Sequence, residues 1–229
     1  MVSRALRSNI TSPPVKPGDR TRDQLFEAAG EVFAAKGYDR ATSREICDRA
    51  GANAAAVNYY FGGFDGLYAA TLAHAHHRLI KIELLNAIVS SDIDARAKLR
   101  AVLASIVRLL LEPTSWEVRL LGREIASPTP SAQNALFETE ILPKVRLIRV
   151  MIGELIGCDP DDPTVGRALL TTVAPCIFLA LVDRAKIERI LPAIADPLTE
   201  AEAVVDHFQR FILAGLDAVA LNHRQGASR

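Results

Sequence analysis

Most of the sequence consists of amphipathic segments that open with a helix start signal. In this signal a Ser, Thr or Asp is followed three residues later by Glu or Gln, and the two side chains can satisfy backbone N–H groups of the first turn. Examples are Thr21/Gln24, Thr42/Glu45 and Thr199/Glu202. Apolar residues then recur at helical spacing, and no stretch shows the alternating polarity of a half-buried strand. The sequence therefore predicts an all-α fold.

We expect nine helices, with Gly or Pro marking most of their ends. Their approximate ranges are 21–36, 42–50, 53–61, 65–89, 91–112, 116–126, 131–157, 164–190 and 199–222. Pro143 and Pro175 fall inside two of these ranges, where a proline removes one backbone hydrogen bond and bends the helix. The range 65–89 is predicted to be one long helix.

The chain has 229 residues, of which 49% are hydrophobic, and its 27 basic side chains balance 27 acidic ones. This apolar content supports a sizeable core and excludes disorder for most of the chain. The charge is unevenly placed, because the first 22 residues hold five Lys or Arg and one Asp. We expect residues 1–20 to form a flexible basic arm, which either approaches a polyanion or is a solvated tail.

Nothing in the sequence indicates export or membrane insertion. The N-terminus has no apolar segment of the signal-peptide type. The most apolar stretch, 169–182, is too short to span a bilayer and is predicted to be a helix buried on most sides. Cys47, Cys158 and Cys176 lie far apart, which argues against a disulfide framework and a structural zinc site. We expect a cytoplasmic protein without a membrane partner.

Two short predicted helices, 42–50 and 53–61, are joined by a turn that contains Gly51. Glycine can adopt the backbone conformation that a tight turn requires. Packed on a longer first helix, such a pair forms a helix-turn-helix unit, whose second short helix enters the DNA major groove. We therefore expect a DNA-binding domain over 21–64, followed by a helical ligand-binding and dimerisation domain over 65–229.

The stretch from Thr21 to Tyr68 resembles the N-terminal domain of TetR-family transcriptional repressors. The similarity rests on the Ala-Ala…Phe…Lys-Gly run of the first helix, the Thr-x-x-x-Ile start of the second and the Tyr-Tyr-Phe end of the third. The segments Asn58–Gly63 and Arg123–Pro128 and the Pro175-Cys176 helix also resemble the CecR-like subgroup. This resemblance implies a repressor that binds a palindromic operator as a dimer and is released by a small organic effector.

The resemblance also implies roles for individual residues. Thr42 and the N–H groups beside it would lie against a phosphate, Arg44 would reach phosphate or a base edge, and Tyr59 matches a tyrosine that anchors phosphate. The predicted DNA contacts are Thr42, Ser43, Arg44, Asn53, Ala54, Ala56, Asn58, Tyr59 and Tyr60.

Two features of this predicted surface bear on specificity. The three alanines 54–56 can pack on thymine methyl groups, and Asn53 and Asn58 are candidate adenine-binding side chains, so we expect a preference for A·T pairs. Alternatively, the alanines are simply good helix formers. Phe64 stands where the family commonly has a Lys, which should lower the salt dependence of binding by about one unit.

The last two predicted helices carry apolar stripes broader than one core requires. We expect them to form a four-helix interface in a homodimer, with an internal core as the alternative. The predicted interface residues are Leu169, Val173, Ile177, Val204, Phe208, Phe211 and Gly215.

The helices between these two regions are expected to hold the effector, because helices bent at proline leave gaps. The candidate walls are Trp116, Leu120, Arg123, Phe137, Cys176 and Phe178, each of which could also be ordinary core or surface. The long helix 65–89 would act as a lever between this pocket and the DNA-binding domain.

Other functions find less support. His74, His76 and His77 form a cluster in which His74 and His77, three residues apart, could share a metal. No acidic residue lies a turn away on the same face and no HExxH motif is present, so we expect a partly solvated face and no metal. Because GxSxG, Walker and dinucleotide motifs are missing, we expect no catalysis and no cofactor. The remaining alternative is a helical small-molecule-binding or catalytic protein without DNA binding. The basic arm favours the regulator, whereas Phe64 and the low charge of the DNA-binding domain favour the alternative.

Overall fold

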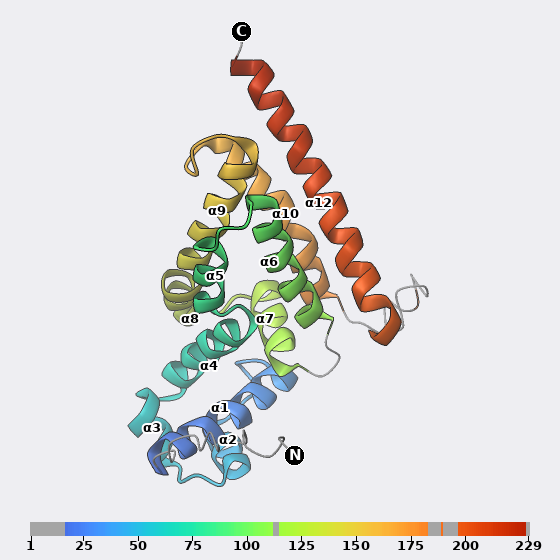
Figure 1. The fold of residues 1–229 in the computed structure, drawn as a ribbon. Helices are drawn as coiled ribbons and strands as arrows, with labels where there is room; N and C mark the ends of the chain where they lie inside the picture. Colours follow the sequence, from blue (N-terminus) through green and yellow to red (C-terminus); the bar gives the residue numbers. More distant parts are fainter. Residues whose placement is uncertain (1–16, 112–114, 183–188, 190–196, 228–229) are drawn as a thin grey trace, which may run out of the picture.

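The computed structural model describes residues 17–111, 115–182, 189 and 197–227, which are helical apart from the connecting turns and contain no strand (Figure 1). The all-α prediction is confirmed. The first helices are α1 (Pro17–Lys36), α2 (Ser43–Ala50), α3 (Ala55–Phe61), α4 (Phe64–Leu79), α5 (Ile82–Val89) and α6 (Ala95–Leu110). They are followed by α7 (Trp116–Ala126), α8 (Pro130–Leu136), a π-helical turn η1 (Phe137–Ile141), α9 (Leu142–Ile156), α10 (Pro163–Leu181) and α12 (Pro197–Ala227).

Aspartate side chains cap the starts of α6 and α10. The Asp94 carboxylate accepts from the Ala97 N–H at 2.8 Å at the start of α6. The Asp162 carboxylate accepts from the Thr164 N–H at 2.6 Å, and Pro163 occupies the first turn of α10. Such caps satisfy N–H groups that have no partner within the helix.

Other predicted starts are wrong, because a helix begins earlier at a proline. Thr21 lies inside α1, which begins at Pro17, and Thr199 lies inside α12, which begins at Pro197. Proline is favourable at the first helical position, since its missing N–H has no helical partner there. Thr114 lies outside the described residues, and the cap of α7 is Ser115, whose hydroxyl accepts from the Val118 N–H at 3.3 Å.

The predicted long helix 65–89 is in fact two helices. Ile80 has an extended backbone, with φ −133° and ψ 97°, and it separates α4 from α5. The Ile80 side chain packs against the core formed by α5, α6, α9, α10 and α12. The prediction of one lever helix that runs unbroken to Val89 is therefore wrong. Helix α4, which follows α3, ends at Leu79.

The predicted helix 131–157 is divided by the π-helical turn Phe137–Ile141. Its widened hydrogen bond runs from the Leu142 N–H to the Phe137 carbonyl, immediately before Pro143. A proline ring conflicts with the carbonyl four residues earlier in a regular α-helix, and a π-turn is one way in which a helix adapts. The bend expected at Pro143 thus takes the form of this turn.

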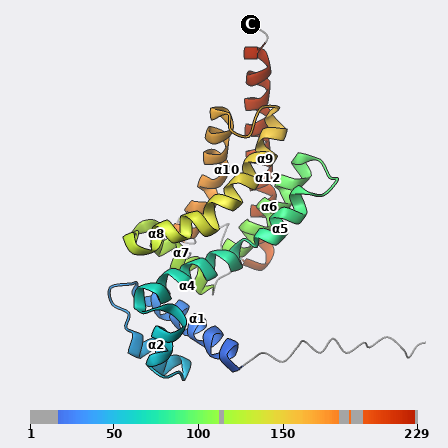
Figure 2. The ribbon, with the colours of Figure 1, turned by 90° about the vertical axis from the view of Figure 1, so that its left-hand side faces the viewer.

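Two main apolar cores divide the molecule in a way that the domain prediction did not anticipate. The first unites α1–α4 with side chains of α7 and α8, including Trp116, Leu120 and Leu136. The second is built by α5, α6, α9, α10 and α12. Figure 2 shows α1 and α2 at one end, with α4 rising from them towards α5 and the remaining helices. Helix α7 therefore packs with the N-terminal helices, although it is distant from them in sequence.

Helix α10 is far more exposed than expected. Its buried residues are Val165, Ala168, Thr172 and Cys176, whereas Leu170 is 69% and Phe178 57% exposed. The prediction of a helix buried on most sides is thus wrong for the single chain. With a mean hydropathy of 1.7 over 18 residues, α10 is long and apolar enough to span a bilayer, and 22% of that 18-residue stretch is buried in the structure.

Candidate DNA-binding surface and effector cavity

Helices α2 and α3 are joined by the predicted tight turn. The Thr42 hydroxyl caps α2 by accepting from the Glu45 N–H at 3.3 Å. Gly51 then adopts the left-handed region, with φ 62° and ψ 29°, and the Ala52 N–H donates to the Cys47 carbonyl at 2.9 Å. Ile46 and Val57 are buried in the first core, which fixes the two helices against α1. The sequence thus dictates a helix-turn-helix unit, which we call the N-terminal unit (α1–α3).

One face of this unit is exposed and polar. Thr42 and Arg44 at the start of α2 are exposed, and so are Asn58 and Tyr59 on α3. Tyr59 is 83% exposed. These four predicted DNA-contacting residues are accessible from solvent, and Ser43 is partly so.

The structure places three other predicted contacts differently. Ala56 and Tyr60 are partly buried against the first core, while Ala55 is exposed together with Ala54. The Asn53 side-chain oxygen accepts from the Ala55 N–H at 3.0 Å. Asn53 is exposed, and this bond holds its side chain at the start of α3 while using one of the two lone pairs of the amide oxygen.

Phe64 has a packing role at the start of α4. Its ring lies 5.4 Å from that of Phe33 and 5.3 Å from that of Tyr38, measured between centroids. The Tyr38 hydroxyl donates to the carboxylate of Asp65. An aromatic residue at this position thus strengthens the contact between α1 and α4, where a lysine would point to solvent.

A cluster around Trp116 joins the N-terminal unit to α7. The indole lies on Gly30 of α1, and a Cβ at that glycine would overlap the ring. The Nε1–H donates to Glu27 at 2.9 Å, and the Arg78 guanidinium lies 5.8 Å from the ring centroid while pairing with Glu27. Trp116 is 4% exposed. It therefore fastens α1 to α7 and α4.

Arg123 holds the other end of α1. Its guanidinium donates to the carbonyls of Ala34 and Ala35, each at 3.2 Å. These carbonyls belong to the last turn of α1, where no helical N–H is left to pair with them. Arg123 is thus a structural contact between α7 and α1 and lies outside the cavity described next.

A cavity of about 320 Å³ lies among α4, α6, α7, α9 and α10, with the ends of α8 and η1 closing one side. Its walls are mostly aliphatic and include Ile80, Leu103, Ile106, Val145, Ile148 and Val173. A cavity of this size and character suits a small apolar molecule.

The cavity has one polar corner, where buried side chains bond one another. The Lys144 ammonium donates to Glu140 at 2.7 Å, to the His76 ring Nδ1 at 2.9 Å and to the His76 carbonyl at 3.3 Å. The Glu124 carboxylate accepts from the Tyr68 hydroxyl at 2.7 Å and from the Thr129 N–H at 2.8 Å. Burial, helped by the nearby Lys144 charge, lowers the pKa of His76 to about 3. The ring is therefore neutral at pH 7.

Of the six residues predicted to line the effector site, the structure brings Cys176 to this cavity. Burial raises the pKa of its thiol to about 11, so the thiol stays protonated at neutral pH. Trp116 and Leu120 belong to the first core, and Phe137 and Phe178 are exposed. Sequence reasoning missed His76, Glu124 and Lys144 as cavity residues, and the only motif that includes one of them is the histidine cluster of α4.

Six of the eleven exposed large apolar side chains of the described residues lie on α10 and α12. Leu170, Ile177, Phe178 and Leu181 lie on α10, and Phe211 and Leu221 lie on α12. We call these six residues the α10–α12 apolar set. Of the predicted interface residues, Ile177, Phe211 and Gly215 are exposed. The others are partly buried within the chain: Leu169, Val173, Val204 and Phe208.

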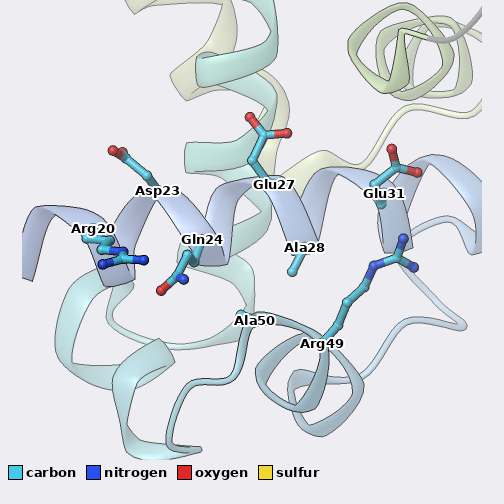
Figure 3. A pocket seen from close by; sticks show the side chains of 8 residues that line it. All are labelled: Arg20, Asp23, Gln24, Glu27, Ala28, Glu31, Arg49 and Ala50. Atoms are coloured by element: carbon cyan, nitrogen blue, oxygen red, sulfur yellow. The ribbon is translucent and has the colours of Figure 1, made fainter.

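Another hollow, an open groove of about 830 Å³, runs along α1 beside the end of α2 (Figure 3). Figure 3 shows Glu27 and Glu31 on α1, with Arg49 reaching from α2 towards Glu31. Glu27 already accepts from Trp116 and Arg78, and Glu31 pairs with Arg119 at 3.2 Å. The groove is thus lined in part by side chains that join the N-terminal unit to α4 and α7. Within the described ranges no group of three metal-binding side chains is found.

Comparison with known families agrees with this architecture. Residues 25–71 match the family described as bacterial regulatory proteins, tetR family. Residues 95–216, more than half of the chain, match the C-terminal domain of the HTH-type transcriptional dual regulator CecR.

Individual relatives are similar over most of their length. The HTH-type transcriptional dual regulator CecR of Shigella flexneri is 30% identical over 162 residues, which cover 63% of this chain and 69% of that protein. The HTH-type transcriptional repressor NicS of Pseudomonas putida is 27% identical over 152 residues, covering 66% of each. The solved structure of FadR from Bacillus subtilis, in complex with stearoyl-CoA, has a TM-score of 0.63 at 15% identity, over 82% of this chain and 97% of that one. The chain belongs to the TetR family of ligand-responsive transcriptional regulators and is of the CecR-like type.

Proposed function

We propose that this regulator binds a palindromic operator in the cytoplasm as a homodimer and represses transcription until a small, mainly apolar effector occupies the 320 Å³ cavity. The observation that carries this proposal is the position of α4. Its first turn follows the recognition helix α3, and its last turn, at His76 and Leu79, lines the cavity.

The DNA contacts in this proposal come from the exposed face of α2 and α3. Thr42, Ser43 and Arg44 would bind the phosphate backbone, with Tyr59 as a second phosphate contact. Base edges would be met by Ala54, Ala55 and Asn58, which are exposed on α3. Ala55 takes the place of the predicted Ala56, and the exposed Asn53 stays a candidate contact at the start of α3.

The dimer would form through the α10–α12 apolar set. A symmetric dimer buries the same patch on both subunits, and patches of large apolar side chains are seldom left in water. Phe211, at 73% exposed, and Leu170, at 69%, are the most exposed apolar residues of this set. A covered α10 also accounts for its apolar composition without a membrane.

The effector would act through α4, which is bonded to the cavity wall at two points. Tyr68 donates to Glu124 on α7, and Lys144 on α9 donates to the ring and carbonyl of His76. At 1.5 Å per residue α4 spans about 24 Å, so a small tilt at the cavity shifts the recognition helix by several ångströms. Two recognition helices must match grooves about 34–36 Å apart, and such a shift would release the dimer.

The domain division at residues 64 and 65 is part of this proposal, with one qualification. Since α7 shares the first core with α1–α4, the helices at 21–64 would move together with α4 and α7. The effector would therefore change the angle between this group and the rest of the chain.

A gel-shift experiment tests the proposal. Wild-type protein should retard DNA from upstream of its own gene, more weakly at higher salt, and Asn58→Ala should bind with little sequence preference. Cys176→Trp, which fills the cavity, should bind the same DNA but no longer respond to effectors. Protein that is folded and dimeric but binds no upstream DNA would favour the alternative of a small-molecule-binding protein without DNA binding.

A further inference from the structure

The polar corner of the cavity contains one hydrogen-bond donor that the protein does not use. The Lys144 ammonium has three N–H groups, and these are taken by Glu140, the His76 ring and the His76 carbonyl. An ammonium can only donate, so the His76 Nδ1 must accept. The ring is neutral, and its single proton is therefore on Nε2.

Other polar groups of the cavity wall already have partners. Both oxygens of Glu124 accept hydrogen bonds, and the Thr172 hydroxyl donates to the Ala168 carbonyl at 2.8 Å. No described residue accepts from the His76 Nε2. The rest of the wall is aliphatic apart from the thiol of Cys176. Since His76 lines the cavity, its Nε2–H is the donor left for a bound molecule, in a polar corner of a mainly aliphatic wall.

The charges around this donor disfavour an ionised ligand. Lys144 is 3% exposed and its charge is balanced by Glu140 at 2.7 Å. Glu124, 5% exposed, adds a carboxylate whose two hydrogen-bond donors, the Tyr68 hydroxyl and the Thr129 N–H, are both uncharged. A carboxylate ligand would bring a second negative charge into this low-dielectric space, at considerable cost.

From this geometry we infer that the effector is an uncharged, mainly apolar molecule with a carbonyl-type oxygen that accepts a hydrogen bond from His76 Nε2–H. The inference rests on the proposed effector cavity and names the chemical class that it takes. His76 is then both the specificity-determining residue and a direct contact on the last turn of α4. Lys144 is a positioning residue, because it fixes the ring and its tautomer without touching the ligand.

Three naphthalene derivatives of similar size test this assignment: acetonaphthone with a ketone, ethylnaphthalene with no polar group and naphthoate with a carboxylate. Their dissociation constants are measured by calorimetry on the full-length protein. His76→Phe should weaken acetonaphthone about tenfold, the effect of one buried hydrogen bond, and should change ethylnaphthalene less than twofold. His76→Gln, which keeps a donor and an acceptor, should restore most of the loss. His77→Phe, the adjacent residue outside the cavity lining, is the matched control.

Nitrogen NMR of wild-type protein labelled in histidine gives a second measurement that needs no variant. His76 should show an unprotonated Nδ1 and a protonated Nε2. Only the Nε2–H signal should shift strongly with acetonaphthone, and neither signal should do so with ethylnaphthalene.

The other outcomes overturn the inference in distinguishable ways. Equal weakening of the ketone and the hydrocarbon by His76→Phe would show that the ring only fills space. Tighter binding of naphthoate than of acetonaphthone, lost in His76→Phe, would replace the uncharged class with an acid. Failure of all three probes to bind wild-type protein would remove the cavity as an effector site, while operator binding in the gel shift would leave the DNA-binding proposal standing.

Discussion

Replacing Gly30 with alanine tests how the N-terminal unit is fastened to the rest of the molecule. In an open helix this change is stabilising by about 0.8–1.0 kcal/mol, because glycine is a poor helix former. At Gly30 the added methyl group would overlap the indole of Trp116, which is 4% exposed and bonded to Glu27. A rigid ring held in this way cannot swing aside, so α1 and α7 must separate.

The expected size follows from these two opposing effects. Overpacking a core costs about 1–3 kcal/mol, and a Cβ that would overlap the ring itself puts Gly30→Ala in the upper part of that range, about 2–3 kcal/mol. Subtracting the gain in helix propensity leaves a net loss of about 1–2 kcal/mol. For a chain of this length that corresponds to a fall in Tm of about 2–8 °C. Gly166→Ala is the matched control, since nothing lies within 4 Å of a Cβ there, and it should leave the Tm unchanged or raise it.

Thermal unfolding followed by circular dichroism measures both variants. Trp116→Phe in the Gly30→Ala background should recover part of the loss, because a smaller ring leaves room for the methyl group. Operator affinity of Gly30→Ala should also fall, since α1 carries the helix-turn-helix unit. A Gly30→Ala protein as stable as the Gly166→Ala control would refute the packing of Trp116 on α1.

Three further predictions address the dimer, the DNA surface and pH. Phe211→Glu should yield folded monomers in light scattering, because an unpaired charge in the interface costs about 3–5 kcal/mol, whereas Phe137→Glu, an exposed phenylalanine on η1, should remain dimeric. Tyr59→Phe should weaken binding to all DNA sequences alike, while Asn58→Ala should flatten sequence preference; equal loss of specificity in both would contradict the assigned roles. Because burial lowers the pKa of His76 from 6.5 to about 3, the unfolded chain takes up this proton first as the pH falls. The free energy of unfolding should therefore drop between about pH 6.5 and 3, by at most about 1.4 kcal/mol per unit, and His76→Gln should flatten that dependence in urea titrations.

Structural features that depend on residues a few positions apart could be predicted from the sequence. The turn at Gly51 requires a left-handed backbone, and the caps at Thr42 and Asp162 require only a side chain and an N–H two or three residues away. Residues close in sequence also decide that the segments are helices, that α2 and α3 form a helix-turn-helix unit, and that Asn58 and Tyr59 are exposed.

Features that depend on distant contacts could not be predicted in this way. The break at Ile80 arises because its side chain joins a core built largely from the C-terminal half. Trp116 resembled a pocket residue by its chemistry, but its position is decided by Gly30, 86 places earlier in the sequence. His76 and Lys144 are 68 positions apart, and no sequence pattern predicts that they form a hydrogen bond. The cavity is therefore a property of the assembled helices.

The double role of α10 bears on how such a regulator can be re-engineered as a biosensor. Thr172, Val173 and Cys176 face the cavity, while Leu170 and Phe178 on the same few turns are exposed. A mutation chosen on this helix to admit a new inducer would also disturb the proposed contact between subunits, and selection for response would then be confounded by loss of assembly. Libraries that vary Leu103 and Ile106 on α6 or Val145 and Ile148 on α9 change the same cavity from other helices. Those positions would let inducer preference evolve while the proposed dimer contact is kept.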